Sequence, residues 1–304
     1  PSWSRCTWSA FVSKGIRKNF MMSDKNYLSV YAKSFNWAGF FLPKKTYKKC
    51  SALYDFCRVA DNIADDEEKL EVKEIKFKQF KKDFVQKNFD NQIVKNMWDL
   101  IDEFKISVKI IEDLLDGINS DIKDKVILNS KKDLLIYSYR VAGTVGLMMA
   151  KILKVNKKSS LKSAIDLGIA MQLTNISRDV IEDSKINRFY INKNFEEITS
   201  TIDLADTFYK NSFYSIKDIP ISFRFSILVA RRIYRKIGYN ILNKKTFENY
   251  KNSGKIYVSN IEKSIETILA FFDLIRLSIT SIKEDQIQHD HFLINEEINL
   301  DERI

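Results

Sequence analysis

Three oxygen-bearing side chains recur at helical spacing near the middle of the chain. Asn175, Asp179 and Asp183 are each four residues apart, so on an α-helix all three lie on one face. Apolar residues flank them. A row of carboxylate and carboxamide oxygens suits Mg²⁺ shared with a phosphate group, because Mg²⁺ is held mainly by oxygen ligands. The stretch therefore predicts a helix that carries a metal site.

A matching polar row lies far upstream. Tyr54, Arg58, Asp61 and Asp65 follow one face of a helix predicted over Cys50–Asp66. A single Asp-x-x-x-Asp pattern usually belongs to an exposed helix face. Two such patterns on otherwise apolar helices are harder to explain in that way, since buried carboxylates need compensating cations. We expect the two helices to face each other across a pocket.

Glycine and proline are scarce, with 8 Gly and 3 Pro in 304 residues. Sheet proteins with many tight turns need more of both, so an all-α fold with short connections is expected. Pro43 marks a helix boundary, and residues 44–49 are expected as a connection. Further helices are predicted at Asn26–Phe41, Glu67–Lys87, Gln92–Phe104, Val108–Ile118, Asp133–Leu153, Ser160–Ser184, Thr201–Lys217, Ser222–Leu242 and Val258–Ser281, with connections at Ile186–Asn194 and Asn249–Lys255.

The predicted helices form one domain over residues 21–290. Residues 1–20 form a basic N-terminal extension that is expected to lie outside the core, and residues 291–304 a polar C-terminal tail. Three cysteines without a CxxC pair favour a reducing compartment, and therefore a cytoplasmic location. No apolar run is long enough to span a membrane.

The formal net charge is +10. This excess has two readings: attraction to an anionic membrane surface or a polyphosphate substrate, or a lysine-rich composition on a solvated surface. Peripheral membrane contact therefore stays open. Nucleic acid is not expected as a partner, because the lysines are scattered and no nucleic-acid-binding motif is present.

Five stretches resemble the squalene/phytoene synthase family, the head-to-head trans-isoprenyl diphosphate synthases, and most of all its bacterial phytoene synthases. In chain order they are Lys33–Phe35 ahead of Pro43, Tyr54–Asp65, Tyr137–Gly146, Gln172–Asp183 and Arg188–Ile191. The resemblance implies an all-α, single-domain isoprenoid synthase fold with a central active-site cavity. It implies a prenyltransferase that condenses two geranylgeranyl diphosphates to phytoene through a cyclopropylcarbinyl diphosphate, in carotenoid biosynthesis. Mg²⁺ is the implied cofactor, with Mn²⁺ as the alternative ion, and NADPH is not expected.

The resemblance also implies roles for individual residues. Metal binding falls to Asp61, Asp65, Asn175, Asp179 and Asp183. Arg58, Arg178 and Tyr190 join the four aspartates in catalysis. Substrate binding falls to Ser34, Phe35, Tyr54, Tyr137, Val141, Gly143, Gly146, Gln172, Asn175 and Arg188. From the residues alone, the two glycines have a second reading, which is close packing of one helix against another.

The chain departs from the family pattern at four positions. Asn62 stands where a second acid is frequent, Val59 where Arg is frequent, Asn187 where Gly is frequent and Asn192 where Pro is frequent. Asn tolerates the left-handed turn that Gly would adopt there, so Asn187 is expected to be a mild change. Val59 and Asn62 would weaken the first metal or phosphate site.

Other functions stay open at this point. A dehydrosqualene or squalene synthase would use two farnesyl diphosphates, and squalene formation would also need a hydride from NADPH. A non-catalytic relative that serves as an assembly scaffold belongs to a different class. Such relatives have usually lost acids from the two motifs, whereas Asp61, Asp65, Asp179 and Asp183 are all present. Downstream carotenoid enzymes are candidate partners.

Overall fold

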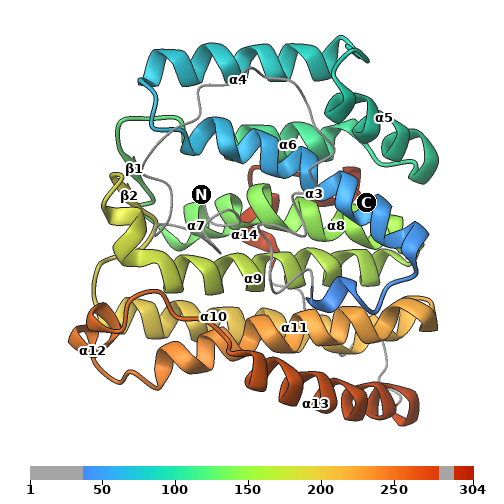
Figure 1. Ribbon diagram of the computed structural model, residues 1–304, viewed down its shortest axis with the longest axis vertical. Coiled ribbons are helices and arrows are strands. Elements are labelled where there is room, and N and C mark those ends of the chain that lie inside the picture. Colours follow the sequence, from blue (N-terminus) through green and yellow to red (C-terminus); the bar gives the residue numbers. More distant parts are fainter. Residues whose placement is uncertain (1–36, 281–290) are drawn as a thin grey trace.

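The computed structural model describes residues 37–280 and 291–304, and its helices stack roughly parallel to one another (Figure 1). The all-α prediction is confirmed. The first half contains α3 (Lys44–Asp65), α4 (Leu70–Val85), α5 (Gln92–Phe104), α6 (Val108–Asn119), α7 (Lys131–Ser138) and α8 (Thr144–Ile152). The second half contains α9 (Lys158–Ser184), α10 (Phe195–Phe213), the 3₁₀ turn η2 (Tyr214–Asp218), α11 (Ile221–Leu242), α12 (Phe247–Asn252) and α13 (Asn260–Ile279). The strands β1 (Val126–Ile127) and β2 (Arg188–Phe189) pair in parallel.

Local signals at the helix ends explain much of this pattern. Asn91 caps α5 by accepting hydrogen bonds from two backbone N–H groups, and Ser259 begins α13 in a capping box with Glu262. The expected connection over residues 44–49 is wrong, because α3 begins at Lys44 directly after Pro43. A proline fits beside the first turn of a helix, where its missing N–H has no partner to lose. The expected connection Asn249–Lys255 is also partly wrong, since it contains most of α12.

The helix predicted over Asp133–Leu153 is interrupted. Between α7 and α8 the backbone forms the π-helical segment η1 (Tyr139–Gly143). Wider π turns insert an extra residue and are often found at functional sites. The sequence pattern carries no mark of this insertion.

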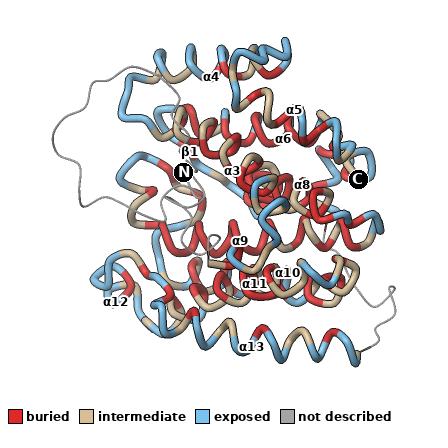
Figure 2. Tube along the Cα trace, turned by 45° about the vertical axis from the view of Figure 1, so that its right-hand side comes forward, coloured by how far each residue is buried: buried red, intermediate tan, exposed pale blue. Residues whose placement is uncertain are grey.

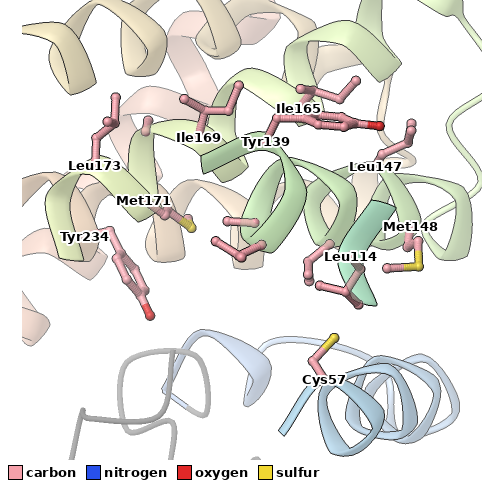
Figure 3. Packing of buried hydrophobic residues seen from close by; sticks show 14 of the residues in the cluster. Cys57, Leu114, Tyr139, Leu147, Met148, Ile165, Ile169, Met171, Leu173 and Tyr234 are labelled. Carbon is pink, nitrogen blue, oxygen red and sulfur yellow. The ribbon is translucent and has the colours of Figure 1, made fainter. Parts of the chain in front are cut away.

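Helix α9 runs through the centre of the molecule and is buried along most of its length (Figures 1 and 2). Its N-terminal half packs Ile165 and Ile169 near Tyr139, Leu147 and other core side chains (Figure 3). A helix enclosed in this way has little room for surface polar residues. The polar groups at its C-terminal end therefore lie inside the protein.

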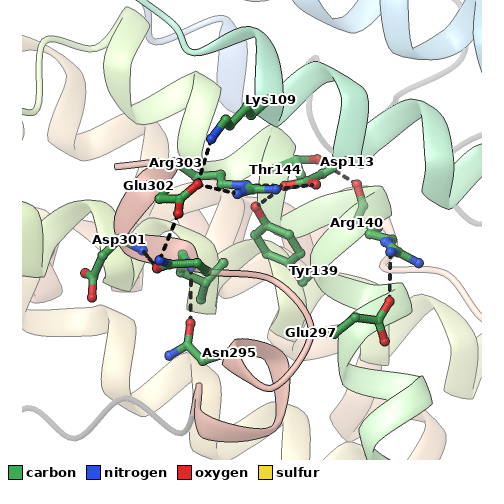
Figure 4. Close-up of polar contacts among 12 residues, drawn as sticks. Lys109, Asp113, Tyr139, Arg140, Thr144, Asn295, Glu297, Asp301, Glu302 and Arg303 are labelled. Carbon is green, nitrogen blue, oxygen red and sulfur yellow. Dashed lines mark hydrogen bonds and ion pairs between the residues drawn. The ribbon is translucent and has the colours of Figure 1, made fainter.

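The expected polar tail is packed against the domain. Residues 291–304 include α14 (Phe292–Asn295) and η4 (Leu300–Glu302), and they bury Ile294, Ile298 and Leu300. Arg303 donates two hydrogen bonds to Asp113, which also accepts one from Tyr139 of η1 (Figure 4). Three apolar residues spaced among acids form this small buried face. The polar composition of the segment gave no sign of it in the sequence.

Some expectations fall outside the described residues. These are the N-terminal extension at 1–20, most of the helix predicted at Asn26–Phe41, and the substrate-binding roles of Ser34 and Phe35. Within the described residues, no helix combines the length and the apolar character needed to cross a membrane.

Candidate active site

The α3 row, made up of Tyr54, Arg58, Asp61 and Asp65, has its two carboxylates near the C-terminal end of α3. Asp61 is buried, while Asp65, one turn later, is partly exposed. Burial raises the pKa of Asp61 to about 6, and the carboxylates of Asp65 and Asp121 add to the rise while Arg58 opposes it. The Asp61 carboxylate therefore lacks enough positive charge around it to offset its desolvation.

The α9 row, made up of Asn175, Asp179 and Asp183, has the opposite electrostatic environment. Arg178 donates two hydrogen bonds to its neighbour Asp179, at 2.9 and 2.6 Å, and Lys255 Nζ lies 3.2 Å from the same carboxylate. Burial works against ionisation, but Arg178 and Lys255 lower the pKa of Asp179 below its usual value. This carboxylate is buried as an anion held by two cations.

The strand β2, which follows α9, connects the two rows. Arg188 Nη1 lies 2.8 Å from Asp65 Oδ1 of α3, and its other terminal nitrogen donates to the backbone carbonyls of Ala64 and Asp121. The left-handed φ of 59° at Asn187 turns the chain into this strand. The expectation that Asn187 replaces Gly in a left-handed turn is confirmed.

Two of the predicted tyrosines form a single polar cluster. The rings of Tyr137 and Tyr190 stack with centroids 4.7 Å apart, and each hydroxyl donates to one oxygen of Asp121 at 2.7 Å. Burial, with the charge of Asp121, raises the pKa of both hydroxyls well above the usual value. Both tyrosines therefore remain protonated hydrogen-bond donors at neutral pH, and Asp183 lies close enough to Tyr190 to contribute to its shift.

The side-chain oxygens along the C-terminal half of α9 are of the type that binds a hard cation. Gln172, Asn175 and Asp183 are all buried. Asn175 Oδ1 has no hydrogen-bond partner among the described residues, and a buried carbonyl oxygen without a partner is costly. Carboxylate and carboxamide oxygens of this type are ligands for Mg²⁺. Across residues 37–280 and 291–304, however, no three His, Cys, Asp or Glu side chains already lie close enough together to hold a metal ion.

An apolar pocket adjoins the other half of α9. It is lined from α8, α9, α10, η2 and α11, including Gly146, Met149, Leu167 and Met171. Met171 is the residue before Gln172, so α9 presents an apolar lining over its first half and oxygen ligands over its second.

The glycines of this region pack helix against helix. A Cβ on Gly146 would lie 2.2 Å from the carbonyl oxygen of Ala164, and one on Gly143 would meet Tyr139 and Ile165. Close packing of η1 and α8 on α9 accounts for both glycines, and Gly146 also lines the apolar pocket. Val141 is buried in η1 and is not among the residues that line this pocket.

The remaining predicted residues lie on α3. Tyr54 and Arg58 are buried, with Arg58 close enough to influence Asp61. Val59 packs partly buried against the core, and Asn62 is partly exposed beside Asp61. Neither residue supplies a positive charge or a further acid to this row.

Three contributing residues were not predicted. Asp121 follows α6 and accepts from both tyrosines, Lys255 precedes α13 and reaches Asp179, and Tyr250 of α12 donates to the carbonyls of Ser177 and Arg178. Each lies far in sequence from the group that it contacts. No local spacing marks such residues, so only the folded chain reveals them.

Sequence comparisons give a consistent result. A family model described as squalene/phytoene synthase matches residues 28–195. A 15-cis-phytoene synthase from Paracoccus sp. is 36% identical over 147 residues, which cover 42% of this chain and only about half (48%) of that relative. A phytoene synthase from Cereibacter sphaeroides is 31% identical over 241 residues, covering 68% of each protein.

Structural comparison points the same way. A crystal structure of a dehydrosqualene synthase in complex with ligand has a TM-score of 0.71 and 27% sequence identity. The match covers 82% of this chain and 94% of that one.

Proposed function

Because the chain belongs to the squalene/phytoene synthase family, we propose that it joins two prenyl diphosphates head to head in an Mg²⁺-dependent reaction. Its phytoene synthase relatives make it an enzyme of the prenyltransferase class. We infer that its substrate is geranylgeranyl diphosphate and its product is phytoene, formed for carotenoid biosynthesis.

The observation that carries this proposal is the division of α9. Its first half lines an apolar pocket and its second half presents Asn175, Asp179 and Asp183. A prenyl diphosphate has the same two parts, an apolar tail and an anionic head. One helix therefore offers a surface for each part of the substrate.

The cationic side chains would bind the diphosphate. Arg58, Arg178 and Arg188 are buried, and guanidinium groups bind phosphate oxygens in pairs. Arg178 and Arg188 now contact Asp179 and Asp65. Held by Asp61, Asp65, Asn175, Asp179 and Asp183, Mg²⁺ would neutralise the leaving diphosphate.

The proposed reaction proceeds in two stages. The C1–O bond of one substrate breaks, the diphosphate takes the electron pair, and the double bond of the second substrate attacks C1. Loss of a proton closes a cyclopropane ring, which leaves a cyclopropylcarbinyl diphosphate. A second ionisation, rearrangement and proton loss give a linear triene. The apolar walls of the pocket exclude water from the cationic stages.

The protonated tyrosines would assist at the polar end. Tyr137 and Tyr190 are held in place by Asp121, and their raised pKa values keep them as donors. We propose that they position the diphosphate by donating hydrogen bonds, in exchange for the bonds that they now give to Asp121.

Incubation of the purified protein with geranylgeranyl or farnesyl diphosphate and Mg²⁺, with and without NADPH, tests the proposal. The expected product is a C40 triene that forms without NADPH. A C30 product would instead support the dehydrosqualene or squalene synthase alternative, which the similar dehydrosqualene synthase structure favours. Absence of turnover with both substrates would contradict the catalytic proposal and support a scaffold role.

We also propose that the enzyme works at the membrane surface beside downstream carotenoid enzymes, since its product does not dissolve in water.

A further inference from the structure

Helix α13 lies at one edge of the molecule (Figure 1). It exposes a stripe of apolar side chains. The stripe repeats every three or four residues, which places its members on one face of the helix. We define the α13 stripe as Ile261, Ile265, Ile268, Phe272, Ile275 and Ile279, all of them exposed and flanked by Leu269 and Phe271. Phe272 is 59% exposed and Ile279 is 79% exposed, so most of each side chain lies in solvent and outside the core. A contiguous exposed apolar face of this kind is typical of an interaction surface.

The charged residues of α13 do not solubilise this face. Glu266 and Asp273 both pair with Arg232 of α11, and Glu262 accepts from Asn240 of the same helix. The opposite face buries Lys263, Ala270 and Leu277. The acids of α13 are thus directed to α11, and the outer stripe is free of acidic side chains.

The segment that leads into α13 is basic. Between α11 and α13 it carries Lys244, Lys245 and Lys251 against one acid, Glu248, and Arg276 is exposed near the far end of α13. The whole chain has a net charge of +10. Basic side chains beside an apolar helix face complement an anionic lipid surface.

A second copy of the chain fits the stripe less well than a bilayer does. At 1.5 Å per residue, the 20 residues of α13 span about 30 Å, and a helix about 10 Å wide offers a footprint of about 300 Å². A stable protein interface needs about 800 Å² on each partner. A single amphipathic helix lying in the bilayer interface, by contrast, is enough for reversible membrane binding.

We propose that the α13 stripe binds the surface of an anionic lipid bilayer, with α13 lying in the plane of the membrane. This rests on the proposed function and names the partner into which a hydrocarbon product would pass. The Ile and Phe side chains enter the boundary between headgroups and acyl chains. The lysines before α13 contact the anionic headgroups and orient the molecule.

Flotation with lipid vesicles tests this surface. The purified full chain is mixed with vesicles of phosphatidylcholine and phosphatidylglycerol, and separately with vesicles of phosphatidylcholine alone. The chain should float with the anionic vesicles, and added salt should weaken this binding. The double variant Ile268→Ser/Phe272→Ser should bind at least about tenfold less, since it removes two apolar side chains that the bilayer would bury.

The matched control removes two exposed apolar residues from the opposite edge of the molecule. Ile75 and Val85 of α4 are 67% and 60% exposed, and Ile75→Ser/Val85→Ser should float like the unmodified chain. Equal flotation of the α13 variant, or no flotation of the unmodified chain, would overturn the proposal. So would a dimer that the α13 variant dissociates, or a marked fall in its melting temperature, since either would show that protein covers the stripe.

Turnover measured with detergent-dispersed substrate separates this proposal from the proposed function. Loss of flotation with turnover intact is expected for the α13 variant. Flotation by a chain that turns over neither substrate would contradict the proposed reaction and leave the lipid-binding surface standing.

Discussion

The two acidic rows have similar sequence patterns but opposite electrostatic environments. On α9, Asp179 is held by Arg178 and Lys255, which lower its pKa despite burial. On α3, Asp61 is buried as well, but no described Arg or Lys forms an ion pair with it, and burial raises its pKa to about 6. The same Asp-x-x-x-Asp spacing therefore gives one row whose first aspartate is neutralised by Arg178 and Lys255, and one row whose first aspartate is costly to ionise.

This difference suggests a division of labour within the proposed reaction. The α3 row gains most from a bound cation, because the cation would remove the cost of ionising Asp61. The α9 row already holds two positive groups that could turn from Asp179 to a diphosphate. Arg188, four residues after the end of α9, forms an ion pair with Asp65 of the α3 row.

The largest expected effect is on turnover. Asp61→Ala and Asp179→Ala should each reduce kcat by about 10³-fold or more, equivalent to about 4 kcal/mol of transition-state stabilisation. Product formation under saturating Mg²⁺ measures the loss, and far-ultraviolet circular dichroism checks that helical content is retained. Full activity in either variant would refute its place in the site.

Stability should separate the two rows. In metal-free buffer at neutral pH, Asp179→Asn should cost about 3 kcal/mol, because it leaves Arg178 and Lys255 buried without their anion. Asp61→Asn should instead stabilise the chain by about 3 kcal/mol, since it removes a carboxylate that is costly to ionise. Urea unfolding measures both changes. Destabilisation of similar size in the two variants would contradict the electrostatic difference between the two rows.

The pH dependence of stability should also differ in sign. The pKa of Asp61 is higher in the folded chain than the ordinary 3.8, so ionising it costs stability as pH rises from about 4 to about 6. Asp179 has a lowered pKa, so its contribution is present above its ordinary pKa and is lost as pH falls below it. Without metal, the free energies of unfolding of the unmodified chain and of Asp61→Asn should therefore move apart by about 2 kcal/mol as pH rises across this range. Parallel curves would count against an uncompensated Asp61.

A smaller effect is expected at Lys255. Asp179 keeps its two hydrogen bonds from Arg178 when Lys255 is removed, so Lys255→Met should reduce turnover by about 10- to 100-fold, the range seen when supporting contacts to a metal site are lost. A rise in KM for the diphosphate substrate should accompany it. Lys251→Met, which changes an exposed lysine in the same connection, is the matched control and should keep the turnover and KM of the unmodified chain with detergent-dispersed substrate.

The sequence predicted those features that depend on local spacing. The helical placement of both rows, the ends of α5 and the left-handed turn at Asn187 all follow from residues close together in the chain. The wide turn at η1 left no such mark. Its position depends on how η1 and α8 meet α9, where glycines bring the backbones into contact.

Long-range partners account for the other differences. Asp121, Lys255 and Arg303 act on groups that are distant in the sequence, and each resembles an ordinary surface residue when read alone. The state of Asp61 depends on the same kind of information. The pKa of a carboxyl group rises when burial and nearby anions outweigh nearby cations, and residue spacing does not report that balance.

The most direct test of the contrast between the rows is to titrate the aspartate carboxyl groups of the metal-free chain by ¹³C NMR. One carboxyl resonance should titrate near pH 6 and be absent from Asp61→Asn, while the resonance lost in Asp179→Asn should titrate below the ordinary aspartate range. An Asp61 carboxyl that titrates at or below about 4, like that of Asp179, would contradict the conclusion that burial makes Asp61 costly to ionise in the metal-free chain.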